Sequence, residues 1–321
     1  MNRFAYLATA MLVFGAGTAQ AAEAQITVYQ GICDASAAVA LDAEHFVVGS
    51  DEGDTLYTYR RSEPTAVAFI DLSRFLGTKV GEESDIEGAT AIGSRIYWIT
   101  SHGRNGKAKL QRSRHRFFAT DIVPGKTPSL KPVGKPYRNL LRDMEMSAAL
   151  KSYNLKSAAR LSAEAEGGLN IEGLAATPQG TLLIGFRNPL PQQRALIIPL
   201  LNPAALIAGG KARFGTPIEL DLGQRGIRSI ERYGAGYLIV AGPTADTGSF
   251  ALFKWSGIAV DAAIPVAGLD LKDLRPEALF AIPSGKEVQL LSDDGGIPVR
   301  GVECKNLPQA DQAFRSLIIT P

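Results

Sequence analysis

One short pattern recurs along this chain and limits what the chain can fold into. Its clearest copies begin at Glu87, Glu172 and Glu277, where a Glu-Gly or Glu-Ala pair is followed by two apolar runs with a tight turn between them. Weaker copies begin at Ser36 and Arg228. Short apolar runs joined by Gly and Pro turns are typical of β-hairpins. We therefore expect a chain built from repeated antiparallel units.

The spacing of the copies predicts a β-propeller. Successive copies start 51, 85, 56 and 49 residues apart, and most of these intervals are close to the ~40 to 50 residues of one blade. A blade is a small sheet that must pack against its neighbours around an axis. The long interval contains residues 138–166, which lack Pro and are rich in helix-forming residues. We expect an all-β fold of five blades with a short helical insertion there, and six blades as the alternative.

The first residues have the layout of a secretory signal peptide. A basic start precedes an apolar segment and the A-x-A cleavage site Ala19-Gln20-Ala21. We therefore expect residues 1–21 to be removed and residues 22–321 to form a single propeller domain that is periplasmic or secreted. No later stretch approaches the ~20 consecutive apolar residues of a transmembrane helix, so no integral membrane segment is expected after cleavage.

The two cysteines, Cys33 and Cys304, flank the first and last copies of the pattern. In an oxidising compartment this even pair predicts a disulfide that joins the first and last blades, with two buried free thiols as the alternative. Residues 26–29 and 316–320 have the composition of strands. We expect them to complete one shared blade, because closing the ring in this way removes exposed sheet edges.

The charge of the chain is balanced overall but not locally. The net charge of +2 favours no nucleic-acid partner. In contrast, residues 104–116 hold seven basic side chains, counting one histidine, and no acidic ones. A solvated loop is the simpler interpretation. The functional interpretation is a docking site for an anion such as a phosphate ester, an acidic glycan or lipid headgroups.

The Pro and Gly content of two stretches predicts their local structure. Residues 121–135 contain three prolines and two glycines and are expected to be an irregular connection. Residues 185–191 follow the second apolar run of the Glu172 copy and are expected to form a rigid turn with Arg187 exposed. Arg187 is therefore a candidate ligand residue on the rim.

The repeated glutamates are the main candidates for chemistry. Residues at one repeat position are related by rotation about the axis, so Glu87, Glu172 and Glu277 are expected to face a common channel together with Arg228. Converging carboxylates raise one another's pKa unless a cation or hydrogen bonds compensate, and Ca²⁺ or Mg²⁺ suits an all-oxygen cluster. Alternatively, each glutamate accepts backbone amide hydrogen bonds from the neighbouring blade and locks the ring.

Polar turns end the second apolar run of three copies. Asp51, His102 and Asp293 occupy corresponding positions in these turns and are expected on one rim. Polar turns that only terminate strands are the alternative. His102, close to Ser101 and Arg104, is the one histidine that we consider as an acid or base, with a plain turn residue as the alternative.

Two of the copies resemble a known family. The segments SDIEG (84–88) with WITSHGRN (98–105), and LNIEGLA (169–175) with GFRNP (185–189), resemble the bacterial family catalogued as domain of unknown function 3616. The resemblance covers nearly the whole mature chain and implies a secreted propeller-like domain with no established activity. More loosely, the Glu-Gly openings and the Ser-Asp-x-Gly turn resemble the esterase-like domain associated with some bacterial phytases.

The absence of several common catalytic and nucleotide-binding motifs narrows the range of possible functions. The chain has no G-x-S-x-G, no H-E-x-x-H, no P-loop and no dinucleotide-binding motif, and it has only three histidines. We expect a binding or scaffold propeller whose rim loops take a small anionic ligand or a periplasmic protein partner. A Ca²⁺- or Mg²⁺-assisted hydrolase of phosphate or carboxylic esters, with Arg104, Arg187 and Arg228 as anion clamps, is the first alternative. A purely structural envelope protein is the second.

Overall fold

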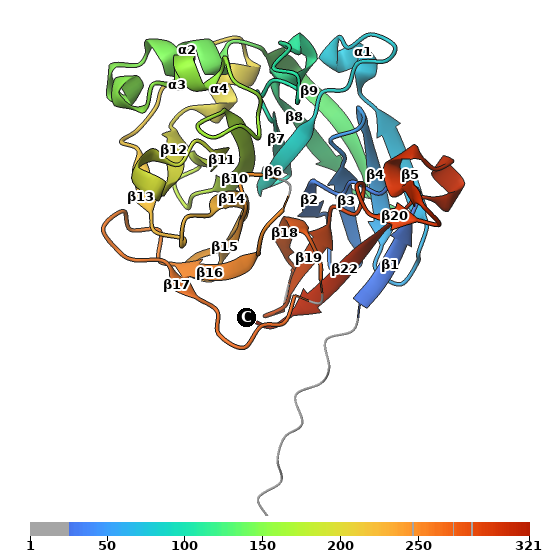
Figure 1. The fold of residues 1–321 in the computed structure, drawn as a ribbon. Coiled ribbons are helices and arrows are strands. Elements are labelled where there is room, and N and C mark those ends of the chain that lie inside the picture. The colour runs from blue at the N-terminus through green and yellow to red at the C-terminus, as the bar shows by residue number, and fades with distance from the viewer. Residues whose placement is uncertain (1–25, 246, 272, 284) are drawn as a thin grey trace, which may run out of the picture.

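The fold is a five-bladed β-propeller, as the repeat predicted. The structure is a computed structural model that describes residues 26–245, 247–271, 273–283 and 285–321. Within these residues, five four-stranded antiparallel sheets are arranged around one axis (Figure 1). The expected signal peptide, residues 1–21, lies outside the described residues. None of the described helices is long and apolar enough to cross a membrane.

Each blade runs from an inner strand at the axis to an outer strand. Blade 1 contains β2 (Ala37–Ala40), β3 (His45–Gly49), β4 (Thr55–Arg60) and β5 (Ala66–Asp71). Blade 2 contains β6 (Ile86–Ile92), β7 (Arg95–Thr100), β8 (Phe117–Val123) and β9 (Ser129–Tyr137). Blade 3 contains β10 (Asn170–Ala176), β11 (Leu182–Asn188), β12 (Ala195–Leu200) and β13 (Ile218–Leu220). Blade 4 contains β14 (Gly226–Tyr233), β15 (Gly236–Gly242), β16 (Ala251–Trp255) and β17 (Ile264–Pro265).

Blade 5 closes the ring with strands from both ends of the chain. It contains β18 (Pro276–Ala281), β19 (Val288–Ser292), the C-terminal β22 (Ala313–Ile319) and, on the outside, the N-terminal β1 (Ile26–Gln30). A small hairpin of β20 (Pro298–Val299) and β21 (Val302–Glu303) lies between β19 and β22 in sequence. The disulfide Cys33–Cys304, with 6.0 Å between its Cα atoms, joins the start of blade 1 to this connection. The predicted shared blade and disulfide are both confirmed.

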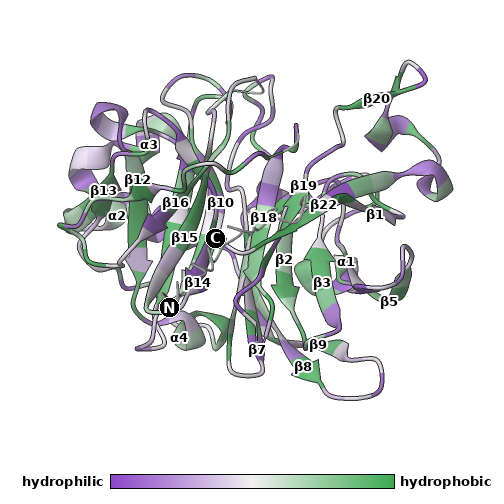
Figure 2. Ribbon diagram, turned by 90° about the horizontal axis from the view of Figure 1, so that it is seen from below, coloured by the Kyte–Doolittle hydropathy of each residue, from purple (hydrophilic) through white to green (hydrophobic). Residues whose placement is uncertain are grey.

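The hydrophobic core is divided among the five interfaces between neighbouring blades. Each described core cluster combines side chains of two adjacent blades. Val47 of blade 1 and Trp98 of blade 2 share one cluster, for example, and Leu238 of blade 4 and Leu290 of blade 5 share another. Figure 2 shows strands such as β2, β19 and β22 largely in the colour of hydrophobic residues. Because no blade buries both faces alone, the blades depend on one another for stability.

The helical insertion predicted between the second and third copies is present. It consists of α2 (Leu140–Met146), the 3-10 helix η2 (Ala148–Tyr153) and α3 (Leu155–Ala158). Leu140, Met144, Leu150 and Leu155 are buried in the cluster between blades 2 and 3. Two other short helices, α1 (Ser73–Leu76) and α4 (Pro203–Ile207), lie in connections between strands. The insertion is therefore packed onto the ring by its apolar side chains.

The outer edge of blade 2 differs from the prediction. Strands β8 and β9 pair from Val123 opposite Ser129 to Phe117 opposite Tyr137, so residues 121–135 are mostly a hairpin and the expected irregular connection is wrong. Pro132 and Pro136 are tolerated within β9 because it is the outermost strand of its sheet. Proline lacks a backbone N–H group, and this group is not needed on a strand edge that pairs with no further strand.

A β-bulge explains the repeated sequence pattern. The pairing of the inner strand shifts register around Glu87 in β6, Glu172 in β10, Arg228 in β14 and Glu277 in β18. A bulge leaves its extra residue outside the regular pairing and redirects the side chain. All four of these side chains line one cavity at the axis. In four of the five blades, the repeat thus delivers one side chain to the axis.

The glycine after the bulge allows close packing of neighbouring blades. A Cβ atom on Gly173 would lie 2.8 Å from the side chain of Ile227 in blade 4. A Cβ atom on Gly88 would lie 3.2 Å from the backbone oxygen of Glu172 in blade 3. Both distances are too short for a comfortable van der Waals contact. The Glu-Gly pair therefore combines an axial side chain with a close approach of the next inner strand.

Candidate functional site

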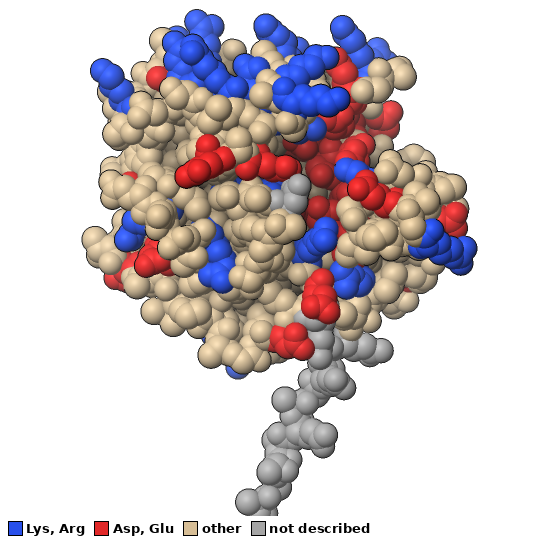
Figure 3. Space-filling view, in the orientation of Figure 1, with Lys and Arg blue, Asp and Glu red and all other residues tan. Residues whose placement is uncertain are grey.

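A polar cavity of about 450 Å³ lies at the end of the axis where the inner strands begin. Figure 3 shows acidic side chains concentrated in the hollow of this face. Among the described residues, ten acidic and six basic side chains line the cavity: Asp34, Asp51, Glu52, Asp85, Glu87, Glu164, Glu172, Glu277, Asp293 and Glu303, with Arg104, Arg114, Arg187, Arg228, Arg275 and Lys305. The excess of acidic groups makes the cavity suited to a cation.

Arg228 neutralises two of the three repeated glutamates. It is 5% exposed and forms ion pairs with Glu172, at 2.8 Å between Nε and Oε2, and with Glu277. The Nε–H group is poorly aligned for a hydrogen bond to Glu172 in spite of this short distance. Arg187 pairs with the other oxygen of Glu172 at 3.1 Å. Blades 3, 4 and 5 are therefore joined at the axis by buried ion pairs, in place of the backbone hydrogen bonds that we considered.

Glu87 occupies the same repeat position but has no such partner. It is 7% exposed, and within the described residues it forms no hydrogen bond or ion pair. Burial raises its pKa well above the ordinary value, and the carboxylates of Glu172, Asp85 and Asp51 raise it further. A buried carboxylate of this kind either holds a proton or requires a cation.

Three further carboxylates gather between blades 5 and 1. Asp34 precedes β2, Asp51 follows β3 and Asp293 follows β19, and one oxygen from each lies within 4.8 Å of the others. Asp34 is 5% exposed, and Oδ1 of Asp51 is buried without a hydrogen-bond partner. Burial, followed by the charge of Asp293, raises the pKa of Asp34 to about 8, and burial raises the pKa of Asp51 well above its usual range. We call these three residues the aspartate cluster.

The backbone around the aspartate cluster is fixed by two features. A Cβ atom on Gly295 would lie 1.4 Å from Oδ1 of Asp34, so only glycine allows this turn to pass the carboxylate. The disulfide also holds the segment, since Asp34 follows Cys33 directly and the amide of Asp294 donates a 3.0 Å hydrogen bond to the carbonyl of Cys33. The spacing of the cluster is therefore set by the ring closure.

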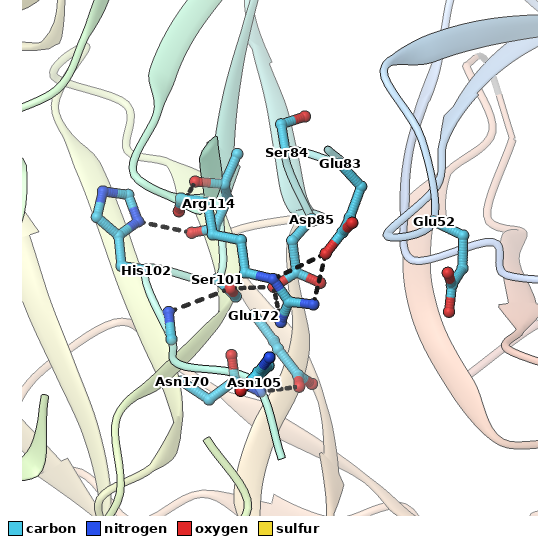
Figure 4. Close-up of polar contacts among 12 residues, drawn as sticks. Glu52, Glu83, Ser84, Asp85, Ser101, His102, Asn105, Arg114, Asn170 and Glu172 are labelled. Atoms are coloured by element: carbon cyan, nitrogen blue, oxygen red, sulfur yellow. Dashed lines mark hydrogen bonds and ion pairs between the residues drawn. The ribbon is translucent and has the colours of Figure 1, made fainter. Parts of the chain in front are cut away.

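Another carboxylate, Asp85, forms a small network at the start of blade 2. It accepts a hydrogen bond from Ser101 Oγ and pairs with Arg114 at 2.9 Å, and Arg114 also pairs with Glu83 at 2.7 Å (Figure 4). Burial raises the pKa of Asp85 to about 6, although the charge of Arg114 opposes this shift. Asp85 is therefore a cavity carboxyl that can exchange a proton close to neutral pH.

Comparisons with known proteins agree with the fold. A family model described as a protein of unknown function, DUF3616, matches residues 138–289. The matched segment runs from the helical insertion to β19 and is similar to this family. The match confirms the main resemblance found in the sequence, and it does not support the weaker likeness to the phytase-associated domain, which stays a prediction. No curated protein matches the chain.

Solved structures similar to this chain include enzymes and a β-propeller domain. A glutaminyl cyclase of Myxococcus xanthus has a TM-score of 0.48 at 12% identity and covers 93% of this chain and 97% of its own. A PQQ-bound aldose sugar dehydrogenase of Streptomyces coelicolor has a TM-score of 0.44 at 12% identity, with coverage of 93% and 99%. The β-propeller domain of Cps50 from Myceliophteria thermophila has a TM-score of 0.41 at 8% identity, with coverage of 92% and 100%. At these identities the likeness concerns the fold alone.

His102 does not reach the cavity. It is 2% exposed, its Nδ1 lies 2.7 Å from the carbonyl of Thr100, and its ring packs 5.3 Å from that of His115. Figure 4 shows it pointing away from Asp85. Burial, together with His115, lowers its pKa to about 3. His102 is therefore neutral at physiological pH and packed as part of the turn.

The arginines predicted as anion clamps already have partners. Arg187 is 7% exposed, so the expectation that it is exposed is wrong; its guanidinium donates to the carbonyls of Pro243 and Ala245 as well as pairing with Glu172. Arg104 donates to the carbonyls of Ala159 and Ala108. Because Arg228 is held by two glutamates, none of the three clamps is available in the form that we expected.

Some residues of the cavity were missed in the sequence. Asp34 and Arg275 were not chosen as candidates, although each lies two residues before the repeat position of its copy, an offset that the cavity residues Asp85 and Asn170 share. Asp51 and Asp293 do occupy corresponding positions in the turns after β3 and β19, and this shared offset is the signal that could have identified the aspartate cluster.

Substitutions at two equivalent glutamates should change stability in opposite directions. In EDTA at pH 8, we expect Glu87→Gln to raise the free energy of unfolding by about 1 kcal/mol, because it removes an unpaired buried carboxylate. We expect Glu172→Gln to lower it by about 3 kcal/mol, because two buried arginines lose their charged partner. The pKa of Glu87 is raised in the folded state. Glu87 therefore destabilises the fold more and more as the pH rises above the pKa of the unfolded chain. The stability gained in Glu87→Gln should accordingly be smaller at pH 5 than at pH 8.

Urea unfolding of both variants at the two pH values measures these effects. Changes of the same sign at pH 8 would show that the two glutamates have equivalent surroundings, contrary to the ion pairs described above.

Proposed function

We propose that this chain is an exported propeller that binds a divalent cation, Ca²⁺ or Mg²⁺, through Asp34, Asp51 and Asp293 at its axial cavity. The observation that carries the proposal is the aspartate cluster itself, with oxygens within 4.8 Å of one another. No lysine or arginine of the described residues forms an ion pair with any of the three. An export route agrees with the Cys33–Cys304 disulfide, since such bonds persist in oxidising compartments.

The chemistry of the cluster favours Ca²⁺. Carboxylate oxygens are hard ligands, and Ca²⁺ binds them at ~2.3–2.6 Å, so two ligands of one ion lie at most roughly 5 Å apart. The 4.8 Å limit of the aspartate cluster fits this span. Ca²⁺ also tolerates the irregular geometry of ligands from three separate loops better than Mg²⁺ does. The buried oxygen of Asp51 without a partner and the unpaired Glu87 both support a cation in this part of the cavity.

A bound cation would also explain how this acidic cavity could bind an anionic ligand. Arg187 and Arg228 are held by glutamates, and the cavity has an excess of acidic side chains. A free anion is therefore repelled by the protein alone, whereas a cation in the aspartate cluster offers it a ligand position. We retain a binding module for a small anionic ligand as the function, with the cation as an essential part of the site.

One observation favours a second candidate, a cation-assisted hydrolase of phosphate or carboxylic esters. Asp85 lines the same cavity with a pKa of about 6, which suits a general acid or base at neutral pH. Hydrolysis of aryl phosphate or ester substrates that requires Ca²⁺ or Mg²⁺ and is lost in Asp85→Asn would favour this candidate over a binding module.

Isothermal titration of Ca²⁺ into chelator-treated protein tests the proposed function. We expect one site per chain, and a loss of affinity of about 100-fold in Asp51→Asn, since affinity follows the number of charged ligands. Because Asp34 has a pKa of about 8, protons compete for the site, and affinity should increase by about tenfold per pH unit between pH 6 and 8.

The control is Asp221→Asn, which alters an exposed carboxylate that accepts only the amide of Gly223. Its affinity should equal that of the wild type. Folded wild-type protein that binds neither Ca²⁺ nor Mg²⁺ would refute the proposal, as would an Asp51→Asn variant with wild-type affinity.

A further inference from the structure

The charge of the chain is divided unequally along the sequence. Residues 104–160 contain 14 Lys or Arg and 3 Asp or Glu. The whole chain contains 34 and 32, which leaves 20 basic and 29 acidic residues for the remainder. One continuous segment therefore has a charge of +11 and the rest has −9, although the net charge is only +2.

This segment forms one part of the fold. It contains the outer half of blade 2 and the helical insertion, and the loop after β7 packs against the insertion through Arg104. The Arg104 guanidinium donates to the carbonyl of Ala159 at 2.7 Å, and the Ala163 amide donates to the carbonyl of Arg104 at 3.2 Å. Figure 3 shows Lys and Arg side chains along the upper edge of the molecule, where Figure 1 places α2 and α1.

Most of these basic side chains have no acidic partner. Eleven of the 14 are exposed and form no ion pair within the described residues. Six of these eleven lie between β7 and β8 or in residues 148–160: Lys107, Lys109, Arg112, Lys151, Lys156 and Arg160. Of the acidic residues of the segment, Asp121 already pairs with Arg95, and Asp143 accepts the hydroxyl of Tyr137. The positive charge of these exposed side chains is therefore available to bind an anionic partner outside the chain.

Apolar side chains are exposed in the same part of the fold. Leu110 is 38% exposed, Met146 74% and Leu161 42%. Leu110 lies in the loop between Lys109 and Arg112, and Leu161 directly follows Arg160. Basic residues next to exposed apolar residues are typical of surfaces that lie on anionic lipid bilayers, where the charges meet the headgroups and the apolar groups enter the boundary. Soluble polyanions would offer these apolar side chains no such environment.

We propose that the six basic side chains, with Leu110, Met146 and Leu161, form a face that docks the protein on an anionic lipid membrane. The charge complementarity is specific to this face, because the remainder of the chain is acidic. The loop that carries Lys107 and Lys109 also contributes Arg104, Asn105 and Gly106 to the wall of the axial cavity. Docking would therefore hold the cavity close to the bilayer surface.

Co-sedimentation with vesicles tests this proposal independently of cation binding. The assay is run in EDTA, so that Ca²⁺ cannot bridge acidic side chains to lipid, with vesicles of phosphatidylcholine alone or with 30% phosphatidylglycerol. We expect binding only to the anionic vesicles and a loss at high salt. A basic residue near such a surface contributes about fivefold to affinity, so Lys107→Glu/Lys109→Glu/Arg112→Glu should lower partitioning by about 100-fold or more.

The matched control reverses three exposed basic residues outside the segment, Lys254→Glu/Lys286→Glu/Arg300→Glu, and should lower partitioning much less. Met146→Ser/Leu161→Ser should weaken the binding that remains at intermediate salt without changing net charge. The proposal is overturned if wild-type protein does not sediment with anionic vesicles, if both triple variants behave alike, or if a soluble acidic polysaccharide at equal charge concentration binds more tightly than the vesicles.

Discussion

A variant in which Cys33 and Cys304 are both replaced by serine should unfold about 5 kcal/mol more easily than the wild type. The bond closes a loop with a sequence separation of 271 residues, and in the chain-entropy account such a loop stabilises a fold by about 5 kcal/mol. The bond also joins blade 1 to the connection inside blade 5, where the ring would otherwise open. Urea unfolding of the variant and of the wild type, compared by midpoint and slope, measures the difference.

The same variant should also lose cation affinity, because Asp34 directly follows Cys33 and depends on it for position. Wild-type protein titrated after reduction is the control for the serine side chains and should behave like the double variant. A loss of stability below about 1 kcal/mol would mean that the blade interfaces alone keep the ring closed.

Substitution of Arg228 is expected to have the second largest effect. Arg228→Met should destabilise the fold by about 3–5 kcal/mol, because Glu172 and Glu277 are left as buried carboxylates with too little positive charge. Methionine keeps an unbranched, flexible side chain of comparable volume, so the loss should come mainly from charge. Thermal and urea unfolding at pH 8 measure it.

A rescue variant separates charge from packing. Arg228→Met/Glu277→Gln removes both partners of one buried ion pair and keeps the Arg187–Glu172 pair, and replacing both partners of a buried ion pair can be close to neutral. We expect it to recover most of the lost stability. Arg225→Met, which removes a guanidinium that donates to Ser249 at the surface, should cost less than about 1 kcal/mol. An Arg228→Met variant as stable as the Arg225→Met control would show that the axial ion pairs contribute little.

The repeat made the ring and its axial residues predictable. A β-bulge that recurs in four of the five inner strands leaves a visible pattern, since the bulged residue is followed by a residue small enough for the next blade to approach. The pairing of Arg228 with its neighbours was also within reach of sequence reasoning. Consecutive copies are adjacent in a ring, so an arginine between two glutamates lies beside both. We treated the glutamates as one converging set and overlooked this order.

Other features depend on contacts that a repeat cannot express. Asp34 shares its offset from the repeat position with Asp85 and Arg275, but its place in the aspartate cluster depends on the disulfide and on the turn at Gly295. Arg187 follows a strand in a Pro-rich turn, which predicts exposure, yet the carbonyls of the blade 4 loop and Glu172 draw it inward. The prolines of β9 suggested an irregular segment because their place at the outer edge of a sheet is a property of the assembled blade.

Cation binding at the aspartate cluster can be tested by an anomalous difference map from crystals of the protein soaked in Tb³⁺, which substitutes for Ca²⁺ at oxygen ligands. We expect one strong peak bonded to the carboxylates of Asp34, Asp51 and Asp293. A peak between Glu172 and Glu277, or no peak at the aspartate cluster, would contradict this expectation.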